Sequence, residues 1–348
     1  MTSVIGKSVK RVEDKRLLTG KGRYVDDMIL PGMTHACILR SHLAHANILG
    51  VDTSAAEQAP GVVAIFTGTD IAESGVGGVP CGWHVDFKNG DTMKEPPHPL
   101  LVADKVRFMG DAVAIVIAET AAQAKDAVEL VEVDYEELPA MVNGPDALKD
   151  GAPLIHQDVP NNTCYDWELG DKSAADQAIE NADHVTTLEF VNQRLIPNAI
   201  EPRSAIGHYD LANDKYTLYT TSQNPHVVRL LMSAFVLGLP EHKVRILSPD
   251  VGGGFGSKIP HYIEEALLVW CSKQINRPIK WTAERNESFM TDTHGRDHAT
   301  KAEMGFDADG KITGLRVKTV ANLGAYLSTF STCVPTYLHG TLLQGLYT

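Results

Sequence analysis

The sequence is short of basic residues, of cysteines and of long apolar stretches. Its 348 residues carry 31 Lys and Arg against 44 Asp and Glu, a formal net charge of −13. Such a balance argues against nucleic acid as the main partner, since phosphate backbones attract clustered basic side chains. No uninterrupted apolar stretch approaches the roughly 18 residues of a membrane-spanning helix. At about 100–200 residues per domain, the length predicts two or three domains.

The cysteines are scattered through the chain, at Cys37, Cys81, Cys164, Cys271 and Cys333. This spacing contains no CxxC pair, so it excludes the usual zinc and iron–sulfur motifs. An odd set of isolated cysteines predicts reduced thiols and therefore a cytoplasmic protein. The N-terminal segment MTSVIGKSVKRVEDKRLL is charged early and lacks the apolar core of a signal peptide.

Strands alternate with helices in the first part of the chain. Runs of β-branched and apolar residues predict strands at 33–41, 61–68 and 112–118, and a helical pattern follows the last of them. Gly and Pro recur over 71–100, which predicts a long loop. The alternation is typical of an α+β or α/β domain. We expect an N-terminal arm, a first domain, a linker and a second domain over residues 1–19, 20–140, 141–165 and 166–348.

Hairpins and helices are also predicted in the second domain. Alternating runs around DLANDK and DADGK predict hairpins over 204–223 and 298–326. The segment 224–240 is predicted to be a helix that ends at Gly238, and 260–275 a second helix. One face of that second helix collects apolar residues, namely Ile263, Ala266, Leu267, Trp270 and Cys271.

A glycine-rich segment, DVGGGFGSK at residues 250–258, lies between a predicted strand and the second helix. Three interpretations compete: a phosphate cradle of backbone N–H groups, close approach of the chain to a bulky organic cofactor, and a tight turn. A Walker A loop requires adjacent Gly and Lys, but Ser257 separates Gly256 from Lys258. A Rossmann fingerprint requires glycine where Ser257 stands. The spacing therefore argues against a common ATPase and against a nicotinamide site.

Single residues in and near this segment keep two interpretations each. Phe255 can pack against a planar ligand or anchor the core. Lys258 can face an anion or lie in solvent at the start of the helix. His42 and His45 have a spacing that metal pairs use, but their segment SHLAHAN favours a loop. The acidic run EVDYEE favours a solvated face.

The motifs around the glycine segment resemble those of a known enzyme family. TSQNPHVVR (221–229) and GLPEHKVRILSPDVGGGFGSK (238–258), together with GRYVDD, LRSHLAHANI, APGVVAIFTG and AIEPRSAIGHYD, closely resemble the large subunit of molybdenum hydroxylases. This is the family of xanthine oxidase, aldehyde oxidase and aerobic carbon monoxide dehydrogenase. The resemblance covers nearly the whole chain. It implies an α+β fold, in which an α/β hammerhead domain precedes the first part of an α/β molybdenum-cofactor-binding domain that is incomplete at its C-terminus.

The resemblance also implies a cofactor site. The cofactor would be molybdenum held by the dithiolene of molybdopterin, often extended by a cytosine dinucleotide. Gln223 matches the family glutamine that hydrogen-bonds a molybdenum oxygen ligand, and a neutral amide can donate there without adding charge. For Glu201 and Arg203 a structural pair is an equal alternative to substrate contact. The implied cofactor-binding residues are Gln223, Gly252, Gly253, Gly254, Phe255 and Gly256, and the implied substrate-pocket residues are Phe255, Glu201 and Arg203.

The implied activity is oxidative hydroxylation of an aldehyde, an N-heterocycle or carbon monoxide, with oxygen taken from water. Purine-oxidising members carry glutamate where this chain has Ile259, so a xanthine-type pocket is disfavoured. The family's catalytic glutamate is expected beyond Thr348, and the chain is expected to be a fragment that is inactive alone. FAD and 2Fe–2S clusters are expected on medium and small partner subunits, in a dimer of heterotrimers. The alternatives are a non-catalytic half-subunit that binds pterin or a partner, and a phosphate- or nucleotide-binding domain.

Overall fold

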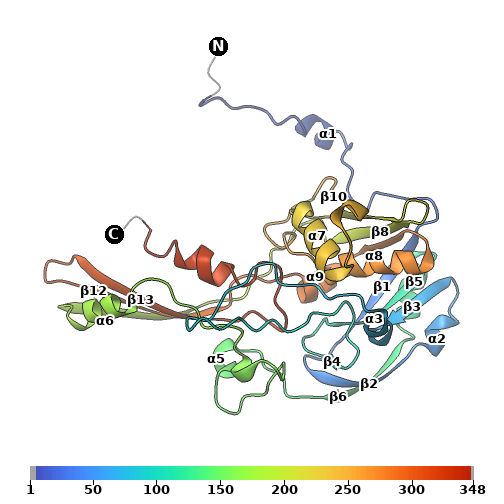
Figure 1. Ribbon diagram of the computed structural model, residues 1–348. Helices are drawn as coiled ribbons and strands as arrows, with labels where there is room; N and C mark the ends of the chain where they lie inside the picture. Colours follow the sequence, from blue (N-terminus) through green and yellow to red (C-terminus); the bar gives the residue numbers. More distant parts are fainter. Residues whose placement is uncertain (1–4, 346–348) are drawn as a thin grey trace.

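A seven-stranded sheet unites the two halves of the chain in the computed structural model, which describes residues 5–345 (Figure 1). Its strands are β1 (Thr34–Arg40), β3 (Val62–Thr67), β5 (Ala112–Ala118), β8 (Ser204–Asp210), β9 (Lys215–Thr220), β10 (Val244–Leu247) and β11 (Ile279–Thr282). Their order across the sheet is β10-β9-β8-β11-β1-β5-β3. The mixture of strands and helices confirms the predicted α+β class.

Strand β5 lies inside this sheet because its sequence, AVAIVIA, offers only apolar side chains to either face. All seven of its residues are buried, and its bounds confirm the predicted strand. Parallel pairing of β1 with β11 places Thr34 opposite Ile279. The two predicted domains therefore share one sheet, while the boundaries proposed for them in the sequence stay predictions.

Helix α8 (Ile263–Ile275) packs against β8 and is buried along most of its length (Figure 1). The two elements approach closely at Gly207, where a Cβ would come within 2.4 Å of the backbone of Leu268. The predicted apolar face is only part of the buried surface, because every residue from 263 to 272 is buried. Glu264 and Glu265 are among them, and buried carboxylates need partners to offset the loss of water.

Shorter helices cover the rest of this body. They are α2 (Ser54–Glu57), α3 (Gly68–Ser74), α4 (Ala121–Val128), α7 (Pro225–Leu231) and α9 (Arg285–Thr291), whereas α5 (Gly144–Ala147) contacts β13 (Ile312–Ala321). Helix α7 continues as a π-helical turn, Met232–Val236, and the chain leaves it through Gly238 at φ +62°, the predicted end. Helix α3 overlaps the start of the predicted loop 71–100. In residues 5–345, no helix is long and apolar enough to cross a membrane.

Two three-stranded sheets flank the body. Their strands are β2 (Ala46–Asp52) between β4 (Lys105–Val106) and β6 (Glu132–Glu137), and β12 (His298–Phe306) between β7 (His184–Asn192) and β13 (Ile312–Ala321). The β7–β12–β13 sheet, with α6 (Lys172–Glu180) packed on β13, extends away from the body in Figure 1. The β8–β9 and β12–β13 pairs confirm the two predicted hairpins.

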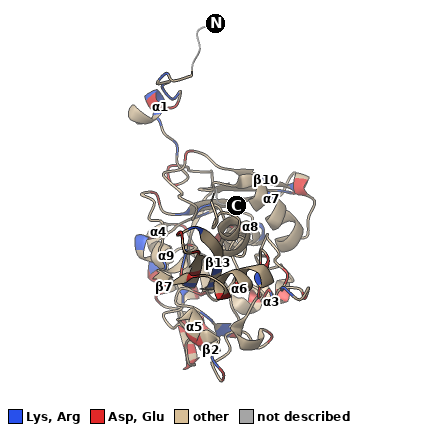
Figure 2. Cartoon of the chain, turned by 90° about the vertical axis from the view of Figure 1, so that its left-hand side faces the viewer, with Lys and Arg blue, Asp and Glu red and all other residues tan. Residues whose placement is uncertain are grey.

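An N-terminal arm, which includes the short helix α1 (Asp14–Leu18), stands clear of the body in both Figure 1 and Figure 2. The arm is tied to the rest of the chain at Asp250, whose carboxylate accepts hydrogen bonds from the Arg16 guanidinium (2.7 Å) and the Arg23 N–H (2.7 Å). These two hydrogen bonds lower the pKa of Asp250 to about 2. The arm therefore joins the body beside the glycine-rich segment.

Candidate functional site

The glycine loop, defined here as residues 250–258, lies at one end of three neighbouring strands of the main sheet, β8, β9 and β10. The loop follows β10, Gln223 follows β9, and Glu201 precedes β8. Because β9 runs parallel to β10 and antiparallel to β8, the end of β9 and the start of β8 lie beside the end of β10. The sheet thus brings together residues that are about 50 positions apart in the sequence.

At two glycines of the loop, a Cβ would clash with side chains of the same chain. A Cβ on Gly252 would come within 2.5 Å of the Glu201 Cβ, and one on Gly254 within 2.3 Å of the Gln223 Oε1. Two others are needed for backbone conformation, because Gly253 has φ +98° and Gly256 has φ +95°. The run of glycines therefore serves both close approach and a sharply turned chain.

The outer side of the loop carries an aromatic ring and an amide. Phe255 is 75% exposed and has φ +51°, so the interpretation of this residue as a core anchor is wrong. The Gln223 side chain is exposed, and its Oε1 accepts a hydrogen bond from the Gly256 N–H at 3.0 Å. With its oxygen held by the loop, the amide keeps its two N–H donors for a ligand on this side.

The inner side of the loop is closed by Lys258. Its side chain is 1% exposed, and its Nζ donates to the Glu201 backbone oxygen (2.8 Å) and to the Glu201 Oε2 (2.9 Å). Burial lowers the pKa of Lys258, while the Glu201 carboxylate opposes that shift. The predicted solvated position of Lys258 is wrong. Its Nζ does face an anion, but that anion is the Glu201 carboxylate of the same chain.

Arg203 lies deeper still, in a buried network of charges. Its guanidinium donates to Glu264 (2.7 Å) and to Asp292, and it stacks 3.7 Å from the ring centre of Tyr262. Glu264 also accepts from Arg40 at 2.6 Å. Burial disfavours the charged form of Glu264, but Arg203 and Arg40 outweigh it and hold the pKa of Glu264 well below its usual value. Arg203 and Glu201 thus have separate partners and do not form the pair that the sequence suggested.

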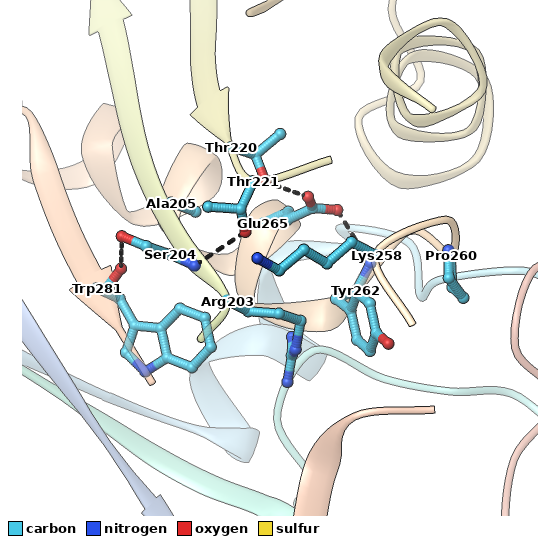
Figure 3. Close-up of a pocket in the computed structure, with 10 residues that line it drawn as sticks. All are labelled: Arg203, Ser204, Ala205, Thr220, Thr221, Lys258, Pro260, Tyr262, Glu265 and Trp281. Atoms are coloured by element: carbon cyan, nitrogen blue, oxygen red, sulfur yellow. Dashed lines mark hydrogen bonds between the residues drawn. The ribbon is translucent and has the colours of Figure 1, made fainter. Parts of the chain in front are cut away.

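Figure 3 shows the space between Arg203, Lys258 and Tyr262. This enclosed cavity measures about 10 Å³, room for roughly one water molecule and too little for a substrate. Its lining is Arg203, Ser204, Ala205, Thr220, Thr221, Lys258, Pro260, Tyr262, Glu265 and Trp281. A ligand of the glycine loop therefore has room only on the outer side, next to Phe255 and Gln223.

The phosphate-cradle interpretation requires several backbone N–H groups that are free to converge on an anion. In the loop, the N–H of Gly252 binds Glu201, the N–H of Gly256 binds Gln223, and the N–H of Ser257 binds the Gly254 oxygen. Lys258, the one cation of the segment, is also occupied. The occupied cation argues against a phosphate or nucleotide site, whereas the N–H groups of Gly253, Gly254 and Phe255 take part in none of these bonds.

The histidines singled out in the sequence lie elsewhere. His45 Nδ1 is 2.8 Å from the Pro139 oxygen, and the His42 ring meets Tyr135 edge-on. Within residues 5–345, no group of three or more His, Cys, Asp or Glu side chains could hold a metal ion. The acidic run forms strand β6, where exposed and half-buried residues alternate.

Several residues that shape the site were missed in the sequence. The Tyr262 hydroxyl donates to the Ser257 oxygen and accepts from the Thr293 N–H at 2.9 Å, so it holds the end of the loop. Glu264 and Asp292 fix Arg203. The available signal was the pair Glu264 and Glu265 at the start of an otherwise apolar helix, since charges in such a position require buried partners.

Two family models match the chain. The one described as "Molybdopterin cofactor-binding domain" matches residues 155–348, more than half of the chain. The one described as "Aldehyde oxidase and xanthine dehydrogenase, a/b hammerhead domain" matches residues 19–139. The chain belongs to the molybdenum hydroxylase large-subunit family. This confirms the family resemblance and the predicted succession of a hammerhead domain and a cofactor-binding domain.

Individual relatives of this family agree with the assignment. The chain is 36% identical to the carbon monoxide dehydrogenase large chain of Afipia carboxidovorans, over 91% of its own length and 39% of that relative's. It is 36% identical to the nicotine 6-hydroxylase large subunit of Paenarthrobacter nicotinovorans, again over 39% of the relative. The nicotinate dehydrogenase large molybdopterin subunit of Eubacterium barkeri is 30% identical, and 72% of it is covered. The chain thus spans about two-fifths of the first two relatives and most of the third.

Solved structures of the family have the same fold. Carbon monoxide dehydrogenase from Oligotropha carboxidovorans superposes with a TM-score of 0.81 at 36% identity, over 90% of this chain and 39% of that one. Quinoline 2-oxidoreductase from Pseudomonas putida 86 gives 0.77 at 33% identity, over 92% of this chain and 39% of that one.

Proposed function

We propose that this chain forms the cofactor-binding part of the molybdenum subunit of a hydroxylase, which oxidises its substrate with oxygen from water. The observation that carries the proposal is the two-sidedness of the glycine loop. Glu201 and Lys258 fill its inner side, whereas its outer side presents the Gln223 amide and the Phe255 ring. Membership of the molybdenum hydroxylase family supports a molybdenum–pterin cofactor as the ligand of that outer side.

The outer side of the loop suits this cofactor in shape and in donor chemistry. An added Cβ on Gly256 would meet no atom within 4 Å, so bare backbone faces open space there. The Gln223 amide is a neutral donor, which suits an oxygen ligand of a metal. We therefore assign Gln223, Phe255 and Gly253–Gly256 to cofactor contact, and Gly252 to the fit between the loop and Glu201.

When bound, a molybdenum cofactor supplies the redox chemistry that removes two electrons from the substrate. The residues of this chain bind and orient. Because the Gly256 N–H fixes the Gln223 oxygen, the amide N–H groups point in one direction and can hold an oxygen atom in place. Phe255, which is 75% exposed, would present its ring to a cofactor bound beside the loop. The proton-accepting glutamate of the family is assigned to no residue of this chain.

The substrate we propose is an aldehyde, an aromatic N-heterocycle or carbon monoxide. Relatives at 36% identity are named for nicotine and carbon monoxide, and the putative xanthine dehydrogenase subunit of Escherichia coli is 28% identical. Ile259 follows Lys258 where purine-oxidising members carry glutamate, and the aliphatic side chain of isoleucine makes no hydrogen bond to a purine nitrogen. A purine substrate is therefore disfavoured.

Partner subunits belong to the same proposal. One relative at 33% identity is named as a subunit of a dehydrogenase complex, that of 6-hydroxypseudooxynicotine. We propose an FAD-binding medium subunit and a 2Fe–2S small subunit as electron acceptors, in a cytoplasmic dimer of heterotrimers. We also propose that the hammerhead and cofactor-binding units divide at the segment 141–165.

The test is to produce the full-length subunit with its partner subunits and to measure molybdenum, pterin and turnover. The substrate panel contains carbon monoxide, an aldehyde, quinoline, nicotinate and xanthine. We expect about one molybdenum per subunit and turnover of one or more non-purine substrates. Folded protein without molybdenum in a host that makes the cofactor would overturn the proposal. Bound molybdenum without turnover of any substrate would favour the non-catalytic alternative.

The matched variants are Gln223→Ala at the loop and Gln177→Ala on the exposed face of α6. Loss of one preorganised donor to a charged or polar transition state typically lowers kcat by about 10²-fold, and we expect this for Gln223→Ala. Gln177→Ala should leave kcat unchanged. Equal kcat values in the two variants would remove Gln223 from the site.

A further inference from the structure

We infer that Glu201 and Lys258 form a buried clamp that sets the shape of the glycine loop, and that both are positioning residues that do not touch the substrate. The inference rests on the proposed function only for the identity of the ligand that the loop holds. It replaces the expectation that Glu201 lines the substrate pocket. Nothing in the family assignment requires this pair to have such a role.

Glu201 holds the first end of the loop by two reciprocal hydrogen bonds. Its N–H donates to the Gly252 oxygen at 3.3 Å, and its Oε2 accepts from the Gly252 N–H at 2.6 Å. The same Oε2 accepts from Lys258 Nζ at 2.9 Å. One carboxylate oxygen therefore joins the first and last residues of the segment 252–258, and the intervening backbone must arch between them.

Lys258 holds the second end by its backbone as well as by its side chain. Its oxygen accepts from the Gln223 N–H at 2.8 Å, and its Nζ donates to the Glu201 backbone oxygen at 2.8 Å. Gln223 then reaches back to the crest of the arch, where its Oε1 binds the Gly256 N–H at 3.0 Å. The clamp thus fixes the amide that we assign to the cofactor and the arch that carries Phe255.

The charges of the clamp are placed for support and not for ligand contact. The Lys258 and Glu201 side chains are 1% and 14% exposed, and the cavity that borders Lys258 admits roughly one water molecule. Glu201 Oε1 is buried and has no hydrogen-bond partner among the described residues. Because only Oε2 of the Glu201 carboxylate has partners, the charge of Lys258 is what holds this side chain in place. Removal of either charge should therefore increase the mobility of the loop.

Hydrogen exchange in the full-length subunit tests the clamp directly. Glu201→Gln keeps the shape and an oxygen acceptor for Gly252 but removes the charge that holds Lys258. Lys258→Met removes the cation, and Lys258→Arg retains it. We expect amide exchange of the peptide over 252–258 to accelerate at least tenfold in the first two variants and to recover in part in Lys258→Arg. Exchange at the wild-type rate in Glu201→Gln would overturn the inference.

The control is Glu241→Gln, which removes one charge from the half-exposed pair Arg229–Glu241. It should leave exchange of the loop unchanged, because an exposed pair holds its neighbours only weakly. If a single variant does not fold, the double variant Glu201→Gln/Lys258→Met, which buries no isolated charge, takes its place. In that variant the same acceleration of the loop supports the clamp, and its absence contradicts it.

Kinetics and spectroscopy separate positioning from substrate contact in the holoenzyme. For a positioning role we expect Glu201→Gln to lower kcat at least tenfold, to change KM less than twofold and to broaden the electron paramagnetic resonance signal of reduced molybdenum. A rise in KM with an unchanged spectrum and unchanged exchange would make Glu201 a substrate contact. If the protein binds no molybdenum, the proposed function fails, but hydrogen exchange still decides the clamp.

Discussion

The seven-stranded sheet and the β7–β12–β13 sheet differ in how fully they are covered. Every residue of β5 is buried, whereas every residue of β7 is exposed. The sequences explain part of the contrast, because AVAIVIA has no polar side chain and HVTTLEFVN mixes polar with apolar ones. Even so, Leu188 and Val191 of β7 are 58% and 67% exposed.

The glycine loop belongs to the better covered of these two parts, the body around the seven-stranded sheet. The loop, Gln223 and Glu201 all adjoin strands of the larger sheet, against which helix α8 packs. The site geometry should therefore depend on packing and charge pairing within this body. It should depend little on the three-stranded sheet that extends from it.

The largest effect is expected in the buried charge network of the body. Glu264→Ala removes the carboxylate that Arg40 and Arg203 share and leaves each buried guanidinium with one acidic partner, Glu287 or Asp292, which should cost about 3–5 kcal/mol of unfolding free energy. Urea denaturation of the full-length subunit measures it. Glu241→Ala, which breaks the half-exposed Arg229–Glu241 pair, should cost less than about 1 kcal/mol of unfolding free energy. Equal losses in the two variants would mean that burial does not distinguish these pairs.

Truncation of an apolar side chain should cost more stability in the seven-stranded sheet than in the β7–β12–β13 sheet. Ile115→Ala in β5 opens a cavity in a fully buried strand and should cost about 2–5 kcal/mol. Leu188→Ala in β7 removes a side chain that is 58% exposed and should cost under about 1 kcal/mol. A large loss for Leu188→Ala in urea denaturation would show that something covers β7 in solution.

A further contrast concerns the dependence of stability on pH. Burial raises the pKa of Asp111, just before β5, to about 7, against the hydrogen bond from the Arg107 N–H, which lowers it. The folded state then holds a proton that the unfolded state releases near pH 4, so stability should fall as pH rises between about 4 and 7 and level off above. The slope attributable to Asp111 is at most about 1.4 kcal/mol per pH unit.

Asp111→Asn is the variant that isolates this slope. Urea midpoints between pH 4 and pH 8 should fall less steeply in it than in the wild type. Asp176, in the ion pairs of the β7–β12–β13 sheet, has the opposite behaviour, since Lys172 and Arg316 lower its pKa. Asp176→Asn should lower stability slightly above about pH 4, and this effect should vanish in acid, where the wild-type carboxylate is itself protonated. Identical pH profiles for wild type and Asp111→Asn would refute the assignment.

Local patterns in the sequence predicted most strands and helices, but not the contacts that build the site. The strand at 112–118 could be predicted because seven consecutive residues agree. Pairing of Thr34 with Ile279 could not, because hydrophobic periodicity carries no information on which strands meet. The glycine loop was singled out by its composition and Gln223 by a family motif, and the sheet explains why they converge.

Charged residues were the hardest to interpret. A lysine at a helix start is usually solvated, yet Lys258 is buried because Glu201, 57 positions earlier, lies beside it. Arg203 appeared as a partner for Glu201 because the two are close in sequence. In the fold they diverge, since Glu264 and Asp292 reach Arg203 from α8 and the end of α9. Such partners depend on tertiary structure, which spacing does not encode.

The pairing of β1 with β11 also determines how late in translation the main sheet can be completed. Strand β1 leaves the ribosome about 245 residues before the strand that completes its edge. At 5–20 residues per second this interval lasts roughly 12 to 50 s. During it, β1 is paired with β5 on one side only and presents an open edge of the kind that recruits other chains. A pause in translation before Ile279 would prolong that exposure.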